Sequence, residues 1–317
     1  MRRWTAVILL AAAACGGRPG ATTDVLTILA PASPGGGWDQ TARAMQAALQ
    51  EDAADGSVRV VNVAGAGGTI GLAQFINAGA DRGDALLVTG LIMVGAVLTN
   101  RSAVTLEATT PIARLTGDYE LLVVPADSPY DDLAAFLDAW KRNPGALAIA
   151  GGSAGGTDHM LAGLLAARVG LDPTTVNYVP HSGGGESIAS ILGGQVAAGI
   201  NGVSELAPFV EAGRLRALAI SSAERLPDRP FPTFREQDVD LTLTNWRGVV
   251  GPPNLSDDRR AALAARIAAL RESPAWQATL ARNGWIDLYL AGPAFDAFLE
   301  AERARAAGVL DSIGLLQ

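Results

Sequence analysis

The sequence predicts an α/β protein built from two α/β lobes with a ligand cleft between them. Three observations predict this fold class. Short β-rich runs alternate with helical stretches, which is typical of parallel sheets covered by helices on both faces. The same alternation restarts in the second half of the chain. The chain has 317 residues, more than a single hydrophobic core usually supports.

The first half of the chain contains three strand patterns and two helix patterns. The β-rich runs at 25–29, 59–63 and 86–89 are each followed within two residues by glycine or proline. A helix is predicted from about Trp38 to Gln50, because small and apolar residues recur on one face. A second helix is expected to start near Thr69.

The second half opens with a strong strand pattern at 120–124. Ser128 followed by Pro129 matches an N-cap and a first helical residue, which predicts a helix over 130–142. The alternation continues with strands at 147–150, 176–179, 196–200 and 215–220, and with helices at 159–169, 187–192 and 205–212. A strand at 246–250 then precedes helices at 259–271, 276–283 and 294–307.

These patterns predict one lobe from residues 24–124 plus 246–317 and a second lobe from residues 125–245. Each lobe should have its own sheet, and the C-terminal helices should return to pack on the first lobe. Because the chain would cross twice between the lobes, we expect a cleft at their interface, where small ligands usually bind.

Residues 1–23 are predicted to be a signal peptide and a short tether. Arg2 and Arg3 precede an apolar run that is too short to span a bilayer. The run ends at Cys15, which lies between alanine and glycine as in a bacterial lipoprotein cleavage site, although Ala12 replaces the usual leucine. We therefore expect export to the periplasm or the outer face of the cytoplasmic membrane, with a lipid anchor at Cys15. Ordinary signal cleavage is the alternative.

Composition argues against several classes of function. The formal net charge is −8, which argues against a nucleic-acid partner. Cys15 is the only cysteine, so neither an internal disulfide nor a cysteine-based zinc site is expected. The two histidines, His159 and His181, are too few to make another zinc site. We expect no cofactor and no metal.

Four glycine-rich loops each follow a predicted strand and lead into a predicted helix. They lie at 34–39, 65–69, 152–157 and 181–185. Glycine has no Cβ that would keep a ligand away from the backbone N–H groups. Free N–H groups and the helix dipole at a helix N-terminus favour an anion. Several such loops at one cleft could hold a carboxylate without a lysine, although each could also be only a tight turn.

Two known motifs match parts of these loops incompletely. Residues 65–71 resemble the dinucleotide fingerprint, but Ile70 occupies the third glycine position, and no loop carries the lysine of a nucleotide P-loop. Ser153 lies in a G-x-S-x-G nucleophile elbow, for which Asp172 and His181 would be the triad partners. Hydrolases spread their triad over several strands rather than one βαβ unit. A secreted serine hydrolase using Ser153 is therefore a weaker alternative.

Read in order, the loops and their flanking strands resemble the extracytoplasmic receptors of tripartite tricarboxylate transporters, the Bug receptor family. The matching segments are APASPGGGWDQTAR at 30–43, NVAGAGGTIG at 62–71, NYVP at 177–180 with LGGQV at 192–196, GRLRALAI at 213–220 and WRGVVGPP at 246–253. The resemblance implies a type II periplasmic-binding-protein fold without catalytic activity. It also implies a small carboxylate ligand and, as partners, the large and small integral membrane subunits of a transporter. We expect a monomer.

The resemblance also implies the ligand-binding residues. One carboxylate of the ligand would contact the backbone of the first two loops, namely Gly36, Gly37, Trp38, Asp39, Gly67, Gly68 and Thr69. The second lobe would contribute Ser153, Thr157, His159, Pro180, Ser182, Gly183 and Asn201. Asp158 and Asn201 depart from the residues that many members carry, so they should affect the distal end of the ligand. Asp39 could equally be only a helix cap, and Arg247 is a candidate for a buried cationic contact.

The sequence therefore predicts reversible binding of a di- or tricarboxylate such as citrate, which is then delivered to a transporter. Within the same class, the ligand could be another small organic acid, such as an amino acid, an aromatic acid or nicotinate. A sensor subunit that feeds a membrane kinase would use the same fold.

Overall fold

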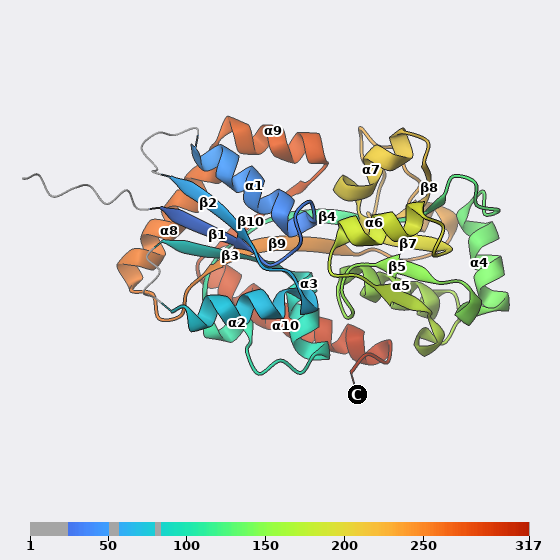
Figure 1. Cartoon of the computed structure of the whole chain (residues 1–317), viewed down its shortest axis with the longest axis horizontal. Helices are drawn as coiled ribbons and strands as arrows, with labels where there is room; N and C mark the ends of the chain where they lie inside the picture. Colours follow the sequence, from blue (N-terminus) through green and yellow to red (C-terminus); the bar gives the residue numbers. More distant parts are fainter. Residues whose placement is uncertain (1–24, 51–56, 80–83, 317) are drawn as a thin grey trace, which may run out of the picture.

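The computed structural model describes residues 25–50, 57–79 and 84–316. Helices pack on both faces of a curled sheet (Figure 1). The strands in this part of the chain are β1 (Leu26–Ala30), β2 (Val58–Asn62), β3 (Ala85–Gly90), β4 (Thr110–Pro125), β5 (Ile149–Gly151), β6 (Tyr178–Pro180), β7 (Ala198–Gly202), β8 (Leu215–Ile220), β9 (Thr244–Gly251) and β10 (Ile286–Ala291). The α-helices are α1 (Gly37–Gln50), α2 (Thr69–Asn77), α3 (Leu91–Thr99), α4 (Leu133–Arg142), α5 (Thr157–Arg168), α6 (Gly184–Leu192), α7 (Val203–Glu211), α8 (Asp257–Glu272), α9 (Pro274–Asn283) and α10 (Pro293–Ser312).

The sheet has two parallel regions joined by antiparallel strands. Its order is β2-β1-β3-β9-β4-β7-β5-β6, and β8 and β10 also pair with β4. β1 runs parallel to β2 and β3, and β5 runs parallel to β6 and β7. β4 pairs with β9 from Thr110 to Tyr119, and from Glu120 onward it pairs with β7 and β8. The two predicted sheets are therefore continuous through β4, which is 16 residues long. The predicted lobe limits after residues 124 and 245 stay a prediction.

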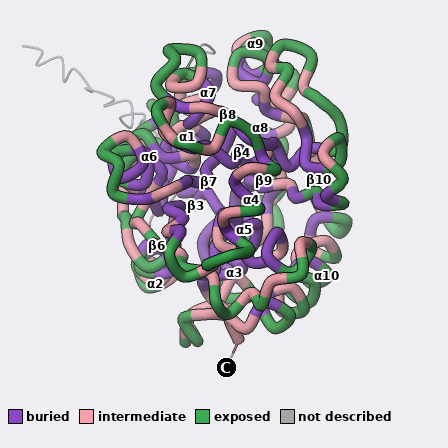
Figure 2. The backbone as a smooth tube through the Cα atoms, turned by 90° about the vertical axis from the view of Figure 1, so that its right-hand side faces the viewer, coloured by how far each residue is buried: buried purple, intermediate pink, exposed green. Residues whose placement is uncertain are grey.

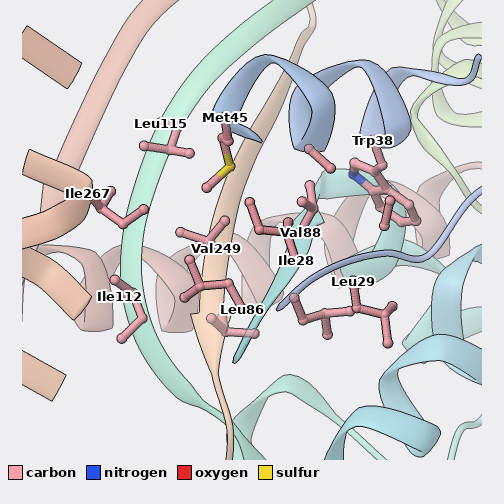
Figure 3. Packing of buried hydrophobic residues seen from close by; sticks show 14 of the residues in the cluster. Ile28, Leu29, Trp38, Met45, Leu86, Val88, Ile112, Leu115, Val249 and Ile267 are labelled. Carbon is pink, nitrogen blue, oxygen red and sulfur yellow. The ribbon is translucent and has the colours of Figure 1, made fainter. Parts of the chain in front are cut away.

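The core of the first lobe fixes the position of α1. Figure 3 shows Trp38 and Met45 of α1 packed over Ile28 and Val88 of the sheet, with Val249 beside them. Each of these five side chains is at most 5% exposed. Burial of a side chain of this size contributes about 1.5–3 kcal/mol. The start of α1, which carries one of the glycine loops, is therefore held on a rigid support.

The second lobe buries apolar residues on both faces of its sheet. Leu122 and Val124 of β4 belong to one hydrophobic cluster, and Leu121 and Val123 belong to another. This split follows from the two-residue period of a strand. Figure 2 shows that the buried backbone is concentrated in the central strands, whereas exposed segments lie mainly in the outer helices and loops.

The C-terminal helices differ from the prediction in one respect. α8 and α9 contribute Ile267 and Trp276 to the core of the first lobe, as expected for helices that pack there. α10, however, places Leu310 and the following Ile313 in the hydrophobic cluster of the second lobe. Ile313 lies so close to Gly163 of α5 that a Cβ on that glycine would be 2.8 Å from its Cδ1. The C-terminal segment thus contacts both lobes.

The start of α4 corrects another prediction. Instead of Ser128, the N-cap is Asp132, whose Oδ1 accepts a hydrogen bond from the Ala135 amide at 2.8 Å. Asp is as good an N-cap as Ser, and the helix begins at the first buried residue, Leu133.

The predicted signal peptide and Cys15 lie outside the described residues. No helix within the described residues is long and apolar enough to cross a membrane.

Candidate functional site

A cavity of about 50 Å³ lies between the two lobes, where the glycine loops meet. Most of the predicted ligand-binding residues line it: Gly36, Gly37, Trp38, Gly67, Gly68, Ser153, Ser182, Gly183 and Asn201. The starts of α1 and α6 face each other across it, since a Cβ on Gly36 would be 3.9 Å from the Gly184 amide nitrogen (Figure 1). Loops that are far apart in sequence therefore surround one small space.

The first loop presents the N-terminus of α1 to the cavity. Gly35 has a φ of +88°, which allows the sharp turn before the helix. Gly37 must lack a Cβ because such an atom would be 2.6 Å from Nη2 of Arg247. The first N–H groups of a helix have no partner within the helix, so those of Gly37 and Trp38 are available to an anion.

Asp39 stabilises this loop and is not among the residues that line the cavity. Its Oδ2 accepts hydrogen bonds from the Gly35 amide at 2.8 Å and from Arg43 Nε at 2.9 Å. Its Oδ1 accepts from Asn62 Nδ2 at 2.9 Å. Burial alone would raise the pKa of Asp39, but the bonds from Arg43, Gly35 and Asn62 outweigh it and hold the pKa below its ordinary value. Asp39 therefore stabilises the loop that precedes α1.

The second loop turns on residues with positive φ. Gly67 and Gly68 have φ values of +62° and +90°, and Ala66 adopts +49°. A Cβ on Gly68 would be 2.6 Å from the ring of Trp38, so this glycine is required by both its conformation and its neighbour. Thr69 points back into its own loop, where its hydroxyl donates to the Ala66 carbonyl at 2.9 Å. The Gly68 amide also donates within the loop, to Gly65.

The second lobe contributes two carboxyl groups to the cavity: Asp158, which was expected near the distal end of the ligand, and Glu205, which the sequence did not assign to the ligand. Asp158 of α5 lines the cavity, and its Oδ2 accepts from the Gly152 amide at 2.6 Å. Asn201 donates to the same oxygen at 3.4 Å and accepts from Ser187 at 2.8 Å. Glu205 of α7 also lines the cavity. Its Oε1 is buried and has no hydrogen-bond partner among the described residues.

Arg247 of β9 is the cation of the site. The residue is 1% exposed, and its Nη2 lies 3.4 Å from Oδ2 of Asp118, which also accepts from Ser204 Oγ at 2.6 Å. The guanidinium also lies over the Trp285 ring, 5.1 Å from its centroid. Its Nη1 has no hydrogen-bond partner in the described part of the chain. A buried charged donor without a partner costs free energy, so Nη1 favours an acceptor in the cavity.

Three further carboxyl groups surround this cation and are hard to ionise. Burial raises the pKa of Asp158 to about 6 and that of Glu205 to about 7. Burial, followed by the nearby carboxylates of Asp158, Asp118 and Glu205, raises the pKa of Glu120 well above its ordinary value. Asn245 donates to Oε1 of Glu120 at 2.9 Å. The cavity thus has more acidic than basic side chains.

The other predicted residues lie behind or beside the cavity. His159 accepts from the Gly155 amide at 3.2 Å and stacks on the Tyr178 ring at a centroid distance of 4.0 Å. Burial lowers the pKa of His159 to about 4, so the ring is neutral near pH 7. Thr157 is buried but is not among the residues that line the cavity. Pro180 lines an adjoining cavity of about 310 Å³, which shares Gly67, Ser153 and Ser182 with the first.

The geometry does not support a hydrolase triad. Asp172 accepts from the amide and hydroxyl of Thr174 at 2.9 and 2.7 Å. The His181 ring faces the carbonyl oxygens of Gly151 and Val179. No hydrogen bond joins Ser153, Asp172 and His181 within the described ranges.

A larger cavity of about 440 Å³ lies elsewhere, between α3 and α10. Its surface is mainly apolar, and four of its five charged side chains form the Arg260–Asp296 and Arg303–Glu107 ion pairs. None of the glycine loops reaches it. The interlobe cavity is therefore the better candidate site, despite its smaller volume.

Comparison with known proteins agrees with the fold. The model of the tripartite tricarboxylate transporter family receptor matches residues 41–315. Protein BugT of Bordetella pertussis is 29% identical over 295 residues, which cover 91% of this chain and 89% of BugT. A protein in the tcbD-tcbE intergenic region of Pseudomonas sp. strain P51 is 31% identical over 232 residues, or 72% of this chain and 68% of that protein.

Solved structures show the same fold at low sequence identity. The periplasmic binding protein BugD has a TM-score of 0.81 at 22% identity, over 92% of this chain and 98% of BugD. MatC of Rhodopseudomonas palustris, solved with malate, has a TM-score of 0.79 at 24% identity, over 90% and 98% of the two chains. Another R. palustris protein, solved with adipate, has a TM-score of 0.81 at 23% identity, over 91% and 97%. The fold is that of periplasmic binding proteins.

Proposed function

Because this chain belongs to the family of tripartite tricarboxylate transporter receptors, we propose that it captures a small organic acid in the interlobe cavity and delivers it to the transporter's membrane subunits. The proposal is supported by Arg247, which lines the same cavity as the starts of α1 and α6 and whose buried Nη1 has no hydrogen-bond partner in the described part of the chain. Both features favour a negatively charged oxygen.

The energies are sufficient for a carboxylate. A partly buried helix N-terminus stabilises an anion by up to about 2 kcal/mol. A hydrogen bond from a charged donor such as Arg247 Nη1 contributes about 1.5–3 kcal/mol. Together these contacts could hold one carboxylate of the ligand on the wall formed by the first lobe.

Close approach of the lobes supports capture by closure. α3 of the first lobe touches the loop before α5 in the second lobe, where a Cβ on Gly95 would be 2.0 Å from the Gly155 carbonyl oxygen. Gly67 similarly lies near Ser153. Since β4 and β9 both run between the lobes, bending at these strands would open the cavity, and closure on a ligand would signal to the transporter.

Calorimetric titration tests the proposed function directly. The panel consists of succinate, malate, adipate, citrate and aspartate, with glucose and putrescine as controls. We expect at least one of the acids to bind at micromolar or lower Kd, and neither control to bind. Tight binding of glucose or putrescine without binding of any acid would overturn the proposal. Citrate is included because the sequence predicts a citrate-like ligand.

Replacing Gly95 with alanine should weaken ligand binding without unfolding the protein. The new Cβ would collide with the Gly155 carbonyl only when the lobes are closed, so the open state would be favoured. Ala also has a higher helix propensity than Gly, by about 1 kcal/mol. We expect at least a tenfold rise in Kd by calorimetry, with a midpoint of urea unfolding no lower than that of the parent. Unchanged affinity would show that closure does not require α3 to approach the loop before α5.

We also propose that Cys15 carries the lipid anchor, on the strength of the leader that precedes it. The Cys15→Ala protein should move from the membrane fraction to the soluble extracytoplasmic fraction when expressed with its leader. Mass spectrometry of the parent should give a lipid-modified N-terminal peptide beginning at Cys15. An unmodified N-terminus at another residue would contradict the anchor but not the receptor function.

A further inference from the structure

The cavity presents hydrogen-bond donors and acceptors on opposite sides. On the first-lobe side, Arg247 lines the cavity, and its Nη1 is a buried donor that has no partner in the described part of the chain. On the second-lobe side, Glu205 Oε1 is a buried acceptor in the same situation. Asn245, which also lines the cavity, has an unpartnered buried Oδ1. A ligand that satisfies all of these atoms needs an acceptor at one end and a donor at the other.

Charges on the second-lobe side point to a cationic donor. The charge of Arg247 is already opposed by Asp118, with which it forms a buried ion pair. Asp158 and Glu205 also line the cavity, and Arg247 is the only cation among the described residues that line it, so these two carboxyl groups share its charge with Asp118. A second or third carboxylate of a ligand such as citrate would face these groups and be repelled. An ammonium group would be attracted and would supply the missing hydrogen bonds.

We propose that the ligand is a small zwitterion, an amino acid or a related amino-carboxylate, whose ammonium group is recognised by Asp158 and Glu205. This inference rests on the proposed function, since the carboxylate of the same ligand occupies the first-lobe side. Asp158 is well suited to this role because the Gly152 amide and Asn201 fix its Oδ2.

The preference for an ammonium group should depend on pH. Burial places the pKa of Glu205 at about 7 and that of Asp158 at about 6, so both groups are ionised at pH 8 and mostly protonated at pH 5.5. The other charged or titratable groups around them are Asp118 and Glu120 of β4, Tyr178 of β6 and Arg247 of β9. None of these adds a positive charge as the pH rises. The preference should therefore be strongest at pH 8 and weaken as the pH falls.

The test compares acids that differ only in an amino or a hydroxyl group. The pairs are aspartate with malate and alanine with lactate, titrated by calorimetry at pH 8.0 and 5.5. At pH 8.0 we expect at least one amino acid to bind ten times more tightly than its hydroxy partner, and at pH 5.5 this ratio should fall. Hydroxy acids that bind as well as or better than amino acids at pH 8.0 would overturn the zwitterion proposal while supporting the acid receptor. No binding of any acid would instead count against the receptor function itself.

Two conservative variants locate the ammonium contact. Glu205→Gln and Asp158→Asn keep the size of each side chain and remove its charge, so each should reduce the amino-to-hydroxy preference at pH 8.0 at least threefold. Glu211→Gln is the matched control, since Glu211 ends the same helix and is exposed. It should leave the preference unchanged. Thermal unfolding checks that each variant is folded. If both Glu205→Gln and Asp158→Asn kept the parent's amino-to-hydroxy affinity ratio at pH 8.0, these two residues would not recognise the ammonium group.

Discussion

Replacement of Arg247 by methionine is expected to lower the free energy of unfolding by about 3–5 kcal/mol and to raise the Kd for the ligand at least a hundredfold. The loss of stability follows because Asp118 would remain as a buried charge without its cation. The loss of affinity follows because Nη1 is the charged donor available to the ligand carboxylate. Urea unfolding at pH 8 measures the first effect, and calorimetry measures the second.

A double variant separates these two effects. Asp118→Asn combined with Arg247→Met removes both charges of the buried pair, so most of the lost stability should return. The ligand contact would still be absent, and the affinity should stay low. If the double variant bound the ligand as tightly as the parent, Arg247 would have only a structural role and the site would need another anion contact.

Replacement of Gly68 by alanine is expected to cost about 2–4 kcal/mol of stability and to abolish measurable binding. Alanine at a φ of +90° is strained by roughly 1–2 kcal/mol. Its Cβ would also be 2.6 Å from the Trp38 ring and 2.9 Å from Met93, both of which are buried. Overpacking of this kind costs about 1–3 kcal/mol. Displacement of Trp38 would distort the start of α1, where the ligand carboxylate is expected.

Gly79→Ala is the matched control for this variant. Gly79 has a φ of +63°, but a Cβ there would meet no atom within 4 Å. Its substitution should therefore cost only the strain of roughly 1–2 kcal/mol and leave the affinity unchanged. If Gly68→Ala and Gly79→Ala lowered the free energy of unfolding equally, the contact of the new Cβ at position 68 with Trp38 would not contribute to the stability loss.

Much of the fold was predictable because strand and helix patterns alternate locally. The helix predicted over 38–50 begins one residue earlier as α1, and the strand at 246–250 lies within β9. The first half of β4 was missed, since Arg114, Gly117 and Asp118 interrupt its apolar pattern. α3 was also missed, because its apolar residues continue the apolar run of β3 and show no helical periodicity. The contact of α10 with both lobes depends on tertiary packing.

The backbone side of the site was predicted more completely than its charged groups, of which Arg247 and Asp158 were expected from the sequence and Glu205 was not. Glycine loops at helix starts are local patterns, and most of their predicted residues line the cavity. Glu205 carries no such pattern, since a glutamate in the first turn of a helix is common on protein surfaces. The pairing of Arg247 with Asp118 joins residues 129 positions apart, so it follows from the sheet register rather than from spacing.

The site combines two kinds of recognition. The first lobe offers backbone N–H groups and a guanidinium, whereas the second lobe offers carboxylates whose pKa values are raised by burial. A ligand that bridges the two walls would draw the lobes together. The selectivity of the receptor would then depend on the group that faces Asp158 and Glu205.

The ligand carboxylate should lie at the start of α1, which backbone NMR of the deuterated, ¹⁵N-labelled protein can test. Titration with the tightest-binding acid of the calorimetric panel should shift the amide signals of Gly37, Trp38 and Gly67 strongly and saturably. The amide signals of Val97 and Leu98, which line the cavity between α3 and α10, should shift less. Saturable binding that leaves the first three signals in place and shifts the other two would contradict the account.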